Sequence, residues 1–274
     1  MPFWTEARGK MMSTLRINQG PGSAGSALKM AVAVLVVGCC VQACANPGTK
    51  SAAELNEMPS AESIVKRYVE AVGGREALLN LNTRVSEVRV VTHLEWDHPD
   101  KHASIHEVDT LSVYGTSAGE FLIVTRTQDG TMLEGCDGDE EWKVDPSDVV
   151  TVVEPRSARY RWLIDPQFPL NLMHYFPNMK VLGTDTWGTD LGGKDRVFVV
   201  TVDGDESHSL GFDVETGLLT RLGYNCEIRD YRRVDGVLMP MEVAYSRKGG
   251  SSTYYVDTIE HNTKLDPVMF SLAK

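Results

Sequence analysis

Histidine and carboxylate side chains gather in one short stretch of the chain, at His93, Glu95, Asp97, His98, His102 and His106. Imidazole and carboxylate groups are common ligands of zinc and related metals. In a β-hairpin, His93 on one strand could meet His106 on the next, because directly opposed side chains lie close together. Residues 99–101 (PDK) are typical of an exposed turn, however, and a solvated hairpin needs no metal. A metal-dependent enzyme that uses His93 and His106 is therefore an alternative function, and the main interpretation has no metal site.

Residues 188–194 read GTDLGGK and match the spacing of a phosphate-binding loop. In such a loop Ser or Thr follows the lysine, and a helix begins there. Here Asp195 follows Lys194, and the next residues alternate as in a strand. We therefore exclude a nucleotide site. The sequence also holds no H-E-x-x-H and no C-x-x-C motif, so we expect a protein without enzymatic activity and without a cofactor.

The first 45 residues have the features of a signal peptide. Four basic residues precede the apolar stretch Met30–Val41, which is too short to span a bilayer comfortably. Residues 36–39 (VVGC) resemble a lipobox in which Cys39 would be acylated, and Cys44 is the alternative. Residues 43–45 (ACA) would instead suit an ordinary signal peptidase. The sequence thus predicts export to the periplasm, with a lipid anchor in the membrane favoured over a soluble exported protein.

Residues 46–59 are small and polar and predict a flexible tether, which leaves residues 60–274 as one folded domain. Because the leader holds four basic residues and one acidic residue, the rest of the chain has 23 basic and 37 acidic residues, a net charge of −14. This charge would repel phosphate backbones, so nucleic acid is excluded as a partner. Cys136 and Cys226 could form a disulfide after export or remain as half-buried thiols.

The folded domain begins with helices and continues with strands. Ser60 is suited to cap a helix over Ala61–Val72, whose apolar residues recur at helical spacing, and residues 75–81 predict a second short helix. From residue 88 onward apolar residues alternate, and four Asp-Gly dipeptides supply turns. Strands are predicted over residues 88–96, 105–114, 120–127, 131–136, 140–144, 149–153, 196–202, 207–214, 218–224, 226–232, 237–246 and 252–262.

Residues 155–180 interrupt this pattern with an apolar, proline-broken insert. Pro166, Pro169 and Pro177 exclude a central strand and limit any helix to short pieces. About ten strands behind one helix do not form a flat open sheet, because such sheets curl, split or close. The predicted fold class is α+β, mostly antiparallel β, with a curved sheet whose concave side the leading helix partly fills.

Four segments resemble exported proteins related to the outer-membrane lipoprotein-sorting (LolA/LolB-like) family. Residues 63–79 (SIVKRYVEAVGGREALL) resemble the opening helix, and residues 134–146 (EGCDGDEEWKVDP) resemble the family hairpin G-x-D-G-x-x-x-W-x-x-D-P. Residues 230–240 (DYRRVDGVLMP) and 261–270 (HNTKLDPVMF) resemble the closing strands. The resemblance implies an unclosed, curved β half-barrel wrapped around the N-terminal helix, with an apolar cavity for acyl chains. Relatives include a periplasmic carrier, a lipid-anchored acceptor and envelope-stress sensors.

Apolar residues of the strands and the insert are the candidate lining of this cavity: Leu94, Trp96, Phe121, Ile123, Trp142, Trp162, Leu172, Tyr175, Phe176 and Phe198. We expect Trp162, Leu172, Tyr175 and Phe176 to form its mouth, because the insert is apolar yet unsuited to a strand. Each buried acyl methylene would contribute about 0.8 kcal/mol to binding. We therefore predict an envelope protein that binds a lipid or the acyl chains of a lipoprotein. The alternative from another class is a sensor or scaffold that binds an envelope protein through its sheet.

Overall fold

The structure is a computed structural model, and it describes residues 58–98, 101–153, 160–188, 194–203 and 205–271. For residues 95–98, 101–106, 186–188, 194–195 and 205–208 it describes the backbone alone. All described residues belong to the unit Lys50–Lys274. The predicted leader and most of the tether, with Cys39 and Cys44, lie outside the described residues. Within the described ranges, no helix combines the length and apolar character needed to cross a membrane.

The first helix, α2 (Ala61–Val72), forms where the sequence predicts it. The Ser60 hydroxyl accepts a hydrogen bond from the Ser63 N–H, and Gly73 ends the helix with a φ of 141° that favours glycine. Its apolar stripe is buried, including Tyr68 and Val72. A short second helix, α3 (Arg75–Leu79), follows. Helix α2 contacts α5 (Phe168–Tyr175) and strand β12, so its apolar face closes one side of the core.

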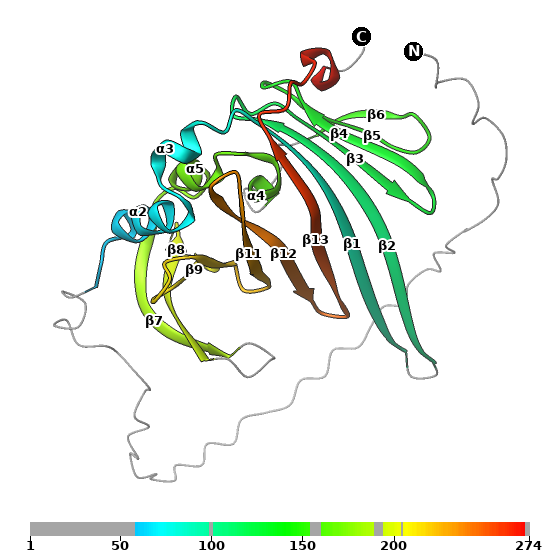
Figure 1. The fold of residues 1–274 in the computed structure, drawn as a ribbon. Coiled ribbons are helices and arrows are strands. Elements are labelled where there is room, and N and C mark those ends of the chain that lie inside the picture. Colours follow the sequence, from blue (N-terminus) through cyan, green and yellow to red (C-terminus); the bar gives the residue numbers. More distant parts are fainter. Residues whose placement is uncertain (1–57, 99–100, 154–159, 189–193, 204, 272–274) are drawn as a thin grey trace, which may run out of the picture. The chain divides into compact units, whose positions relative to one another are not determined.

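Thirteen antiparallel strands in the described part of the chain form one sheet that curves around the helices (Figure 1). Their order across the sheet is β6-β5-β4-β3-β2-β1-β13-β12-β11-β10-β9-β8-β7, so β6 and β7 lie at opposite ends and the sheet is not closed. The strands are β1 (Thr83–His98), β2 (Lys101–Thr116), β3 (Phe121–Thr127), β4 (Gly130–Cys136), β5 (Glu141–Val144), β6 (Val150–Val153), β7 (Lys180–Gly188), β8 (Lys194–Val202), β9 (Asp205–Asp213), β10 (Leu219–Leu222), β11 (Cys226–Val234), β12 (Val237–Arg247) and β13 (Gly250–His261).

The residues between β6 and β7 form two short helices, α4 (Arg161–Ile164) and α5, which lie over the concave side of the sheet (Figure 1). Helix α4 contacts β2 as well as α5. A 3-10 helix, η2 (Pro267–Phe270), follows the last strand and contacts β3. The described part of the predicted insert, residues 160–180, therefore includes the helices that cover the curved sheet.

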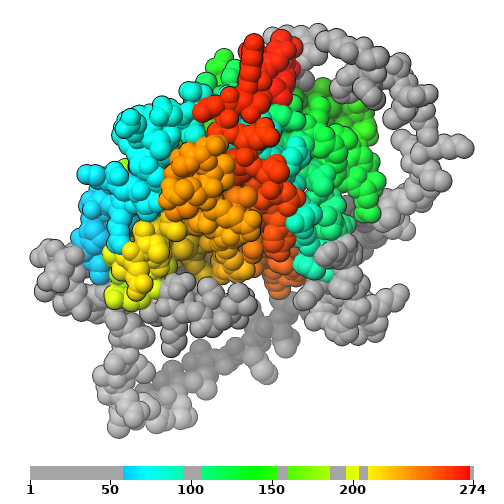
Figure 2. Space-filling view, viewed as in Figure 1, coloured from blue at the N-terminus to red at the C-terminus, as the bar shows by residue number. Residues whose placement is uncertain are grey.

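One apolar core joins the sheet to these helices. The pair Val88 and Leu111 is directly opposed on β1 and β2, Val256 pairs with Val88 from β13, and all three are buried. Near α2, Tyr68 packs edge-on against Phe212 with ring centroids 5.8 Å apart. In Figure 2 helices α2 and α3 and strands β11–β13 form one continuous surface on the face shown. Side chains thus occupy the space between the helices and the strands.

The predicted fold class is confirmed, since the sheet is antiparallel, curved and unclosed around an N-terminal helix. One strand, β7, was not predicted. The strand predicted over residues 237–246 is β12, and it holds Pro240 although it is a central strand. Pro240 pairs with Tyr231 of β11, and the pairing of β12 with β13 begins only at Glu242. The proline is tolerated because no pairing with β13 is lost at its position. Among the predicted turns, Asp235 and Gly236 both have positive φ, as a type I′ turn requires.

Candidate ligand-binding site beneath helix α4

A single row of directly opposed residues crosses the concave face beneath α4. Successive antiparallel pairs place them side by side on β13, β1, β2, β3, β4 and β5, and they are His261, Arg84, Gly115, Phe121, Cys136 and Glu141. Because directly opposed residues in a sheet face the same side, all six point toward the helices. We call this set the α4 row. It combines two charged residues, a histidine and a glycine with apolar neighbours.

Arg84 is the central charged residue of the α4 row and is only 3% exposed. Its Nη2 donates a hydrogen bond of 2.7 Å to the carbonyl oxygen of Trp162 in α4. Burial lowers the pKa of Arg84 to about 10, and the nearby Asp165 carboxylate partly opposes this effect. The guanidinium therefore remains charged at neutral pH. A charged donor to a backbone carbonyl is among the stronger hydrogen bonds in proteins, so strand β1 fixes the position of α4.

Two further residues of the α4 row contact the same helix. The Arg161 guanidinium forms an ion pair of 2.6 Å with Glu141, and it lies 5.7 Å from the centre of the Phe121 ring. Gly115 lies under the end of the helix, where an added Cβ would overlap the carbonyl oxygen of Ile164. Only glycine lets the backbones of β2 and α4 approach this closely. Helix α4 is thus positioned by Arg84, Glu141 and the missing side chain at Gly115.

Asp165, at the end of α4, is a buried carboxylate whose oxygens are all engaged. Its Oδ1 accepts a hydrogen bond of 2.7 Å from the Gln167 N–H. Its Oδ2 accepts bonds from Asn171 Nδ2 at 2.8 Å and from the Tyr175 hydroxyl at 2.9 Å. Burial, followed by the Asp165 charge, raises the pKa of Tyr175, so its phenol stays protonated and donates. The negative charge near Arg84 is therefore held in place by α5.

His261 lies directly opposite Arg84 on β13. Its side chain is 1% exposed, and Nδ1 lies 3.0 Å from the Asp235 carboxylate. The other ring nitrogen, Nε2, is buried and has no hydrogen-bond partner. Burial lowers the pKa of His261, Arg84 lowers it further, and Asp235 opposes both effects. At neutral pH the ring is accordingly uncharged, with its proton on the nitrogen that faces Asp235.

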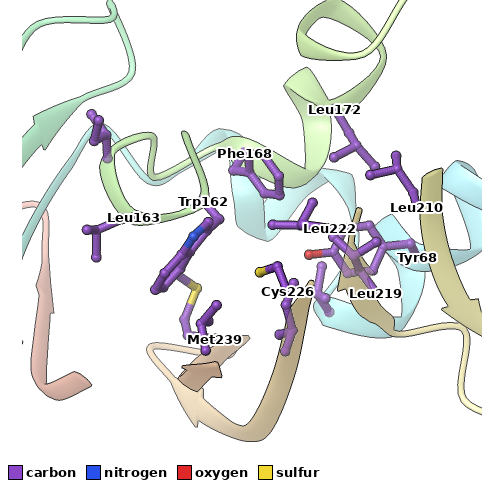
Figure 3. Close-up of a cluster of buried hydrophobic side chains, with 14 of the residues drawn as sticks. Tyr68, Trp162, Leu163, Phe168, Leu172, Leu210, Leu219, Leu222, Cys226 and Met239 are labelled. Atoms are coloured by element: carbon purple, nitrogen blue, oxygen red, sulfur yellow. The ribbon is translucent and has the colours of Figure 1, made fainter. Parts of the chain in front are cut away.

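Two small cavities flank Trp162, each with a volume of about 10 Å³, which is room for about one water molecule. Both are lined by Arg84, Trp162, Met239 and Pro240. The first also touches Tyr68, Asp165, Phe168, Pro169, Ile228, Tyr231 and Leu238, and the second touches Ser86, Leu163, Val256 and Ile259. Figure 3 shows Trp162 extending from α4 toward Met239, with Phe168 and Leu163 on either side. Trp162 therefore borders both spaces, which share part of their lining.

The structure brings most of the predicted lining residues into the apolar core. Phe121, Ile123, Trp162, Leu172 and Phe176 are buried, and Tyr175 and Phe198 are partly buried against the same core. Leu172 is fully buried, so it lies inside the core rather than at a mouth. Of the expected mouth residues, Trp162 is the one that lines both cavities. The side chain of Trp96 lies outside the described residues, and Leu94 is half-buried on β1.

Trp142 does not join this group. It neighbours Glu141 along β5, so it faces the opposite side of the sheet, where its Nε1 donates to the Phe270 carbonyl oxygen at 3.1 Å. Phe198 is also distant in the sheet order, because it pairs with Phe212 next to α2. Sequence reasoning missed Arg84, Gly115, Glu141, Asp165 and His261. Arg84 alternates with Ser86, Val88 and Val90 along the sequence, which places a cation on the apolar face. This pattern is the signal that could have identified Arg84 as a site residue.

The alternative metal chemistry depends partly on His106, whose side chain lies outside the described residues. The register does pair His93 with His106, but no cluster of three or more His, Cys, Asp or Glu side chains that could hold a metal is found among the described residues. Residues 115–119 read GTSAG and match the G-x-S-x-G pattern of serine hydrolases. They form the turn from β2 to β3, whereas a nucleophile elbow joins a strand to a helix. Cys136 and Cys226 are buried and form no disulfide.

No family model and no curated protein matches the sequence, but solved structures share its architecture. A LolA superfamily protein from Nitrosomonas europaea superposes with a TM-score of 0.53 at 12% identity, over 78% of this chain and 99% of that chain. The two chains share a fold. The finding confirms, at the level of the fold, the resemblance carried by the four sequence segments.

Two further solved structures superpose less closely on this chain. A DUF1329 family protein from Desulfovibrio piger gives a TM-score of 0.49 at 12% identity, over 77% of this chain and 96% of that chain. A domain described as part of an outer membrane lipoprotein-sorting protein from Vibrio parahaemolyticus gives 0.43 at 11% identity, over 75% and 95%. At these identities the likeness concerns the fold alone, and function has to be argued from the α4 row and its surroundings.

Proposed function

We propose that this protein is a non-enzymatic carrier of the cell envelope, which binds an acyl chain of a lipid or lipoprotein between α4 and the concave face of the sheet. The observation that supports this most directly is the construction of the cover. Helix α4 closes an apolar interior, and polar bonds at Arg84 and Arg161 hold it there. A cover of this kind can separate from the sheet without unfolding the strands beneath it.

Displacement of Trp162 is the step that would make room. The two cavities share Arg84, Met239 and Pro240 in their lining, and Trp162 borders both. Moving the indole away would merge the cavities into one apolar groove. In the closed state described here, the protein's own side chains occupy the place that we assign to the ligand.

The energies allow this exchange. Opening α4 breaks two hydrogen bonds from arginine side chains, each worth about 1.5–3 kcal/mol, and the bond of 3.3 Å from Trp162 Nε1 to the Tyr245 hydroxyl, worth about 1 kcal/mol. An acyl chain that buries about twelve methylenes gains about 10 kcal/mol at 0.8 kcal/mol each. The gain from a long acyl chain thus exceeds the cost of the broken polar contacts, whereas the gain from a few methylenes does not.

The proposed cellular setting follows from the N-terminal sequence. A signal peptide over residues 1–45, acylation at Cys39 or Cys44 and a tether over residues 46–59 would hold the domain near a membrane surface in the periplasm. The partners would then be membrane lipids or acylated proteins. The acidic domain, with its net charge of −14 after the leader, does not suit nucleic acid.

Two matched tryptophan variants test the proposal. Trp162 and Trp142 are both buried and both donate an indole hydrogen bond, but only Trp162 lies on the concave side. Truncation of either residue should cost about 3–5 kcal/mol of stability. We expect Trp162→Ala to bind a fluorescent acyl probe about tenfold more tightly than the native protein, because the space is already open. Trp142→Ala should bind like the native protein.

Native mass spectrometry of the full chain, incubated with bacterial phospholipid, gives an independent result. The proposal predicts one lipid adduct per chain, with a higher occupancy for Trp162→Ala than for Trp142→Ala. No adduct for the native protein and for folded Trp162→Ala, at saturating lipid, would contradict a carrier function.

Protein binding along the sheet edge is a second candidate, and one observation favours it. Strand β6 ends the sheet, its described hydrogen-bonded neighbour is β5, and Val150 and Val152 are 51% and 57% exposed. An edge strand with exposed valines is suited to pairing with another chain. Replacing Val152 by Lys should abolish pull-down of an envelope partner without changing lipid binding. If lipid binding fails and this pull-down succeeds, the scaffold function is the correct one.

A further inference from the structure

Arg84 has unused hydrogen-bonding capacity inside the proposed ligand site. A guanidinium has five N–H donors, and the acceptor recorded for Arg84 is the Trp162 carbonyl oxygen at 2.7 Å from Nη2. Its Nε is buried and has no hydrogen-bond partner. An unpaired buried donor costs about 1–3 kcal/mol, so this atom favours any ligand that brings an acceptor to it.

Opening of α4 would leave Arg84 with a further donor that lacks an acceptor. When Trp162 moves away, Arg84 loses the carbonyl oxygen that it now holds. A pure hydrocarbon would fill the apolar space on either side but would leave the guanidinium without an acceptor. A ligand that carries an oxygen acceptor next to its acyl chain replaces the lost bond.

The positive charge of Arg84 is already compensated by Asp165, and this determines whether a charged or an uncharged acceptor suits the site. Asp165 is the negative group that acts on Arg84, and α5 fixes it through Asn171 and Tyr175. The Gln167 side chain, at the start of α5, donates to the carbonyl oxygens of Leu79 and Leu81, so the start of α5 is attached to the end of α3. A second carboxylate brought to Arg84 would be repelled by Asp165. An uncharged oxygen would not.

The remaining surroundings suit a chain that passes Arg84 on both sides. The first cavity is lined by Phe168, Ile228 and Leu238, and the second by Val256 and Ile259. Arg84 lines both. A carbonyl group at Arg84 would thus have apolar space on either side, as an ester or amide has between its two substituents.

We infer that Arg84 is the binding position for an uncharged oxygen acceptor of the ligand, so that the ligand class is an ester- or amide-linked acyl lipid rather than a free fatty acid. This inference rests on the proposed carrier function and adds the chemistry that the site selects. It makes Arg84 a ligand contact in the open state and a contact of α4 in the closed state.

Three probes with the same chain length separate the contributions: hexadecane, palmitic acid and methyl palmitate. They are measured by displacement of a fluorescent acyl probe from the full chain. We expect the native protein to bind the methyl ester about tenfold or more tightly than the hydrocarbon, and more tightly than the acid. Arg84→Met should remove the preference for the ester over the hydrocarbon, and it should not weaken hydrocarbon binding, because it also removes a bond that holds α4 closed. Arg89→Met, on the convex face, is the matched control and should behave like the native protein.

A second measurement does not depend on the folding of the Arg84 variant. The carbonyl stretch of isotope-labelled methyl palmitate, observed by infrared spectroscopy, should shift to lower frequency when it binds the native protein. Equal affinity for ester and hydrocarbon together with an unshifted carbonyl band overturns the inference but leaves the carrier function standing. Tighter binding of the acid overturns it as well. If none of the three probes binds, the carrier function itself is wrong.

Discussion

The guanidinium of Arg84 and the carbonyl oxygen of Trp162 lie 2.7 Å apart, and this one hydrogen bond joins β1 to α4 across 78 residues of sequence. Replacing Arg84 by Met leaves the carbonyl without its donor and the buried Asp165 without its compensating cation. We expect the free energy of unfolding to fall by about 2–4 kcal/mol, measured by urea denaturation. Arg89→Met, which removes an exposed pair with Asp257, should cost less than about 1 kcal/mol. Equal effects of the two variants would show that Arg84 has no special structural role.

The ion pair between Arg161 and Glu141 should contribute more than an exposed pair, because the side chains are only 16% and 7% exposed. A double-mutant cycle with Arg161→Met and Glu141→Gln should give a coupling energy of about 1–3 kcal/mol. The pair of Arg232 and Asp230 is the control, since its side chains are 65% and 39% exposed. Its coupling should be much smaller than that of the buried pair, because both side chains are solvated. Similar coupling in both cycles would mean that α4 is not held by Arg161.

Gly115 lets the backbone of α4 approach β2, and an alanine here should force the two apart. An added Cβ would overlap the Ile164 carbonyl oxygen, whereas the Cβ of Gly135→Ala would overlap the indole of Trp142 on the other face. Both variants should lose about 1–3 kcal/mol of stability through overpacking. Only Gly115→Ala should bind the acyl probe more tightly than the native protein. Enhanced binding by Gly135→Ala would argue against a site beneath α4.

Stability should depend on the protonation of His261. Burial lowers its pKa in the folded protein, so the unfolded chain, with a pKa of about 6.5, takes up the proton first as the pH falls. The free energy of unfolding is therefore fully retained above about pH 6.5 and decreases as the pH falls through the folded-state pKa. Denaturation curves between about pH 7.5 and 5.5 should show this decrease for the native protein and less of it for His261→Gln. His174→Gln, on the exposed side of α5, is the control, and an unchanged slope for His261→Gln contradicts the prediction.

Strands could be predicted from the sequence where alternating apolar residues were bounded by turn residues. Residues 120–127 and 131–136 were predicted as strands, and β3 (Phe121–Thr127) and β4 (Gly130–Cys136) match them within one residue. Strand β7 escaped prediction because its pairing with β8 shifts register between Val181 and Gly183, which interrupts the alternation. The fold class depends on the number and order of such segments and tolerates one missed strand.

The site was less predictable because its contacts join residues far apart in sequence. Composition alone makes Trp142 and Trp162 equivalent, and only the register shows that Trp142 faces η2 while Trp162 faces Arg84. The role of Gly115 depends on a helix that follows it by some fifty residues, and no local pattern encodes that approach. The cover was recognisable as an apolar insert, but the polar bonds that hold it were not.

Quenching of tryptophan fluorescence by a brominated acyl ester tests the carrier function most directly. Two variants are needed, each with a single tryptophan, Trp162 or Trp142, and the other four replaced by phenylalanine. Bromine quenches an indole only at short range, so saturable quenching of Trp162, with Trp142 unaffected, is the predicted result. Binding of the ester without quenching of Trp162, or with quenching of Trp142 instead, would contradict a ligand site between α4 and the sheet.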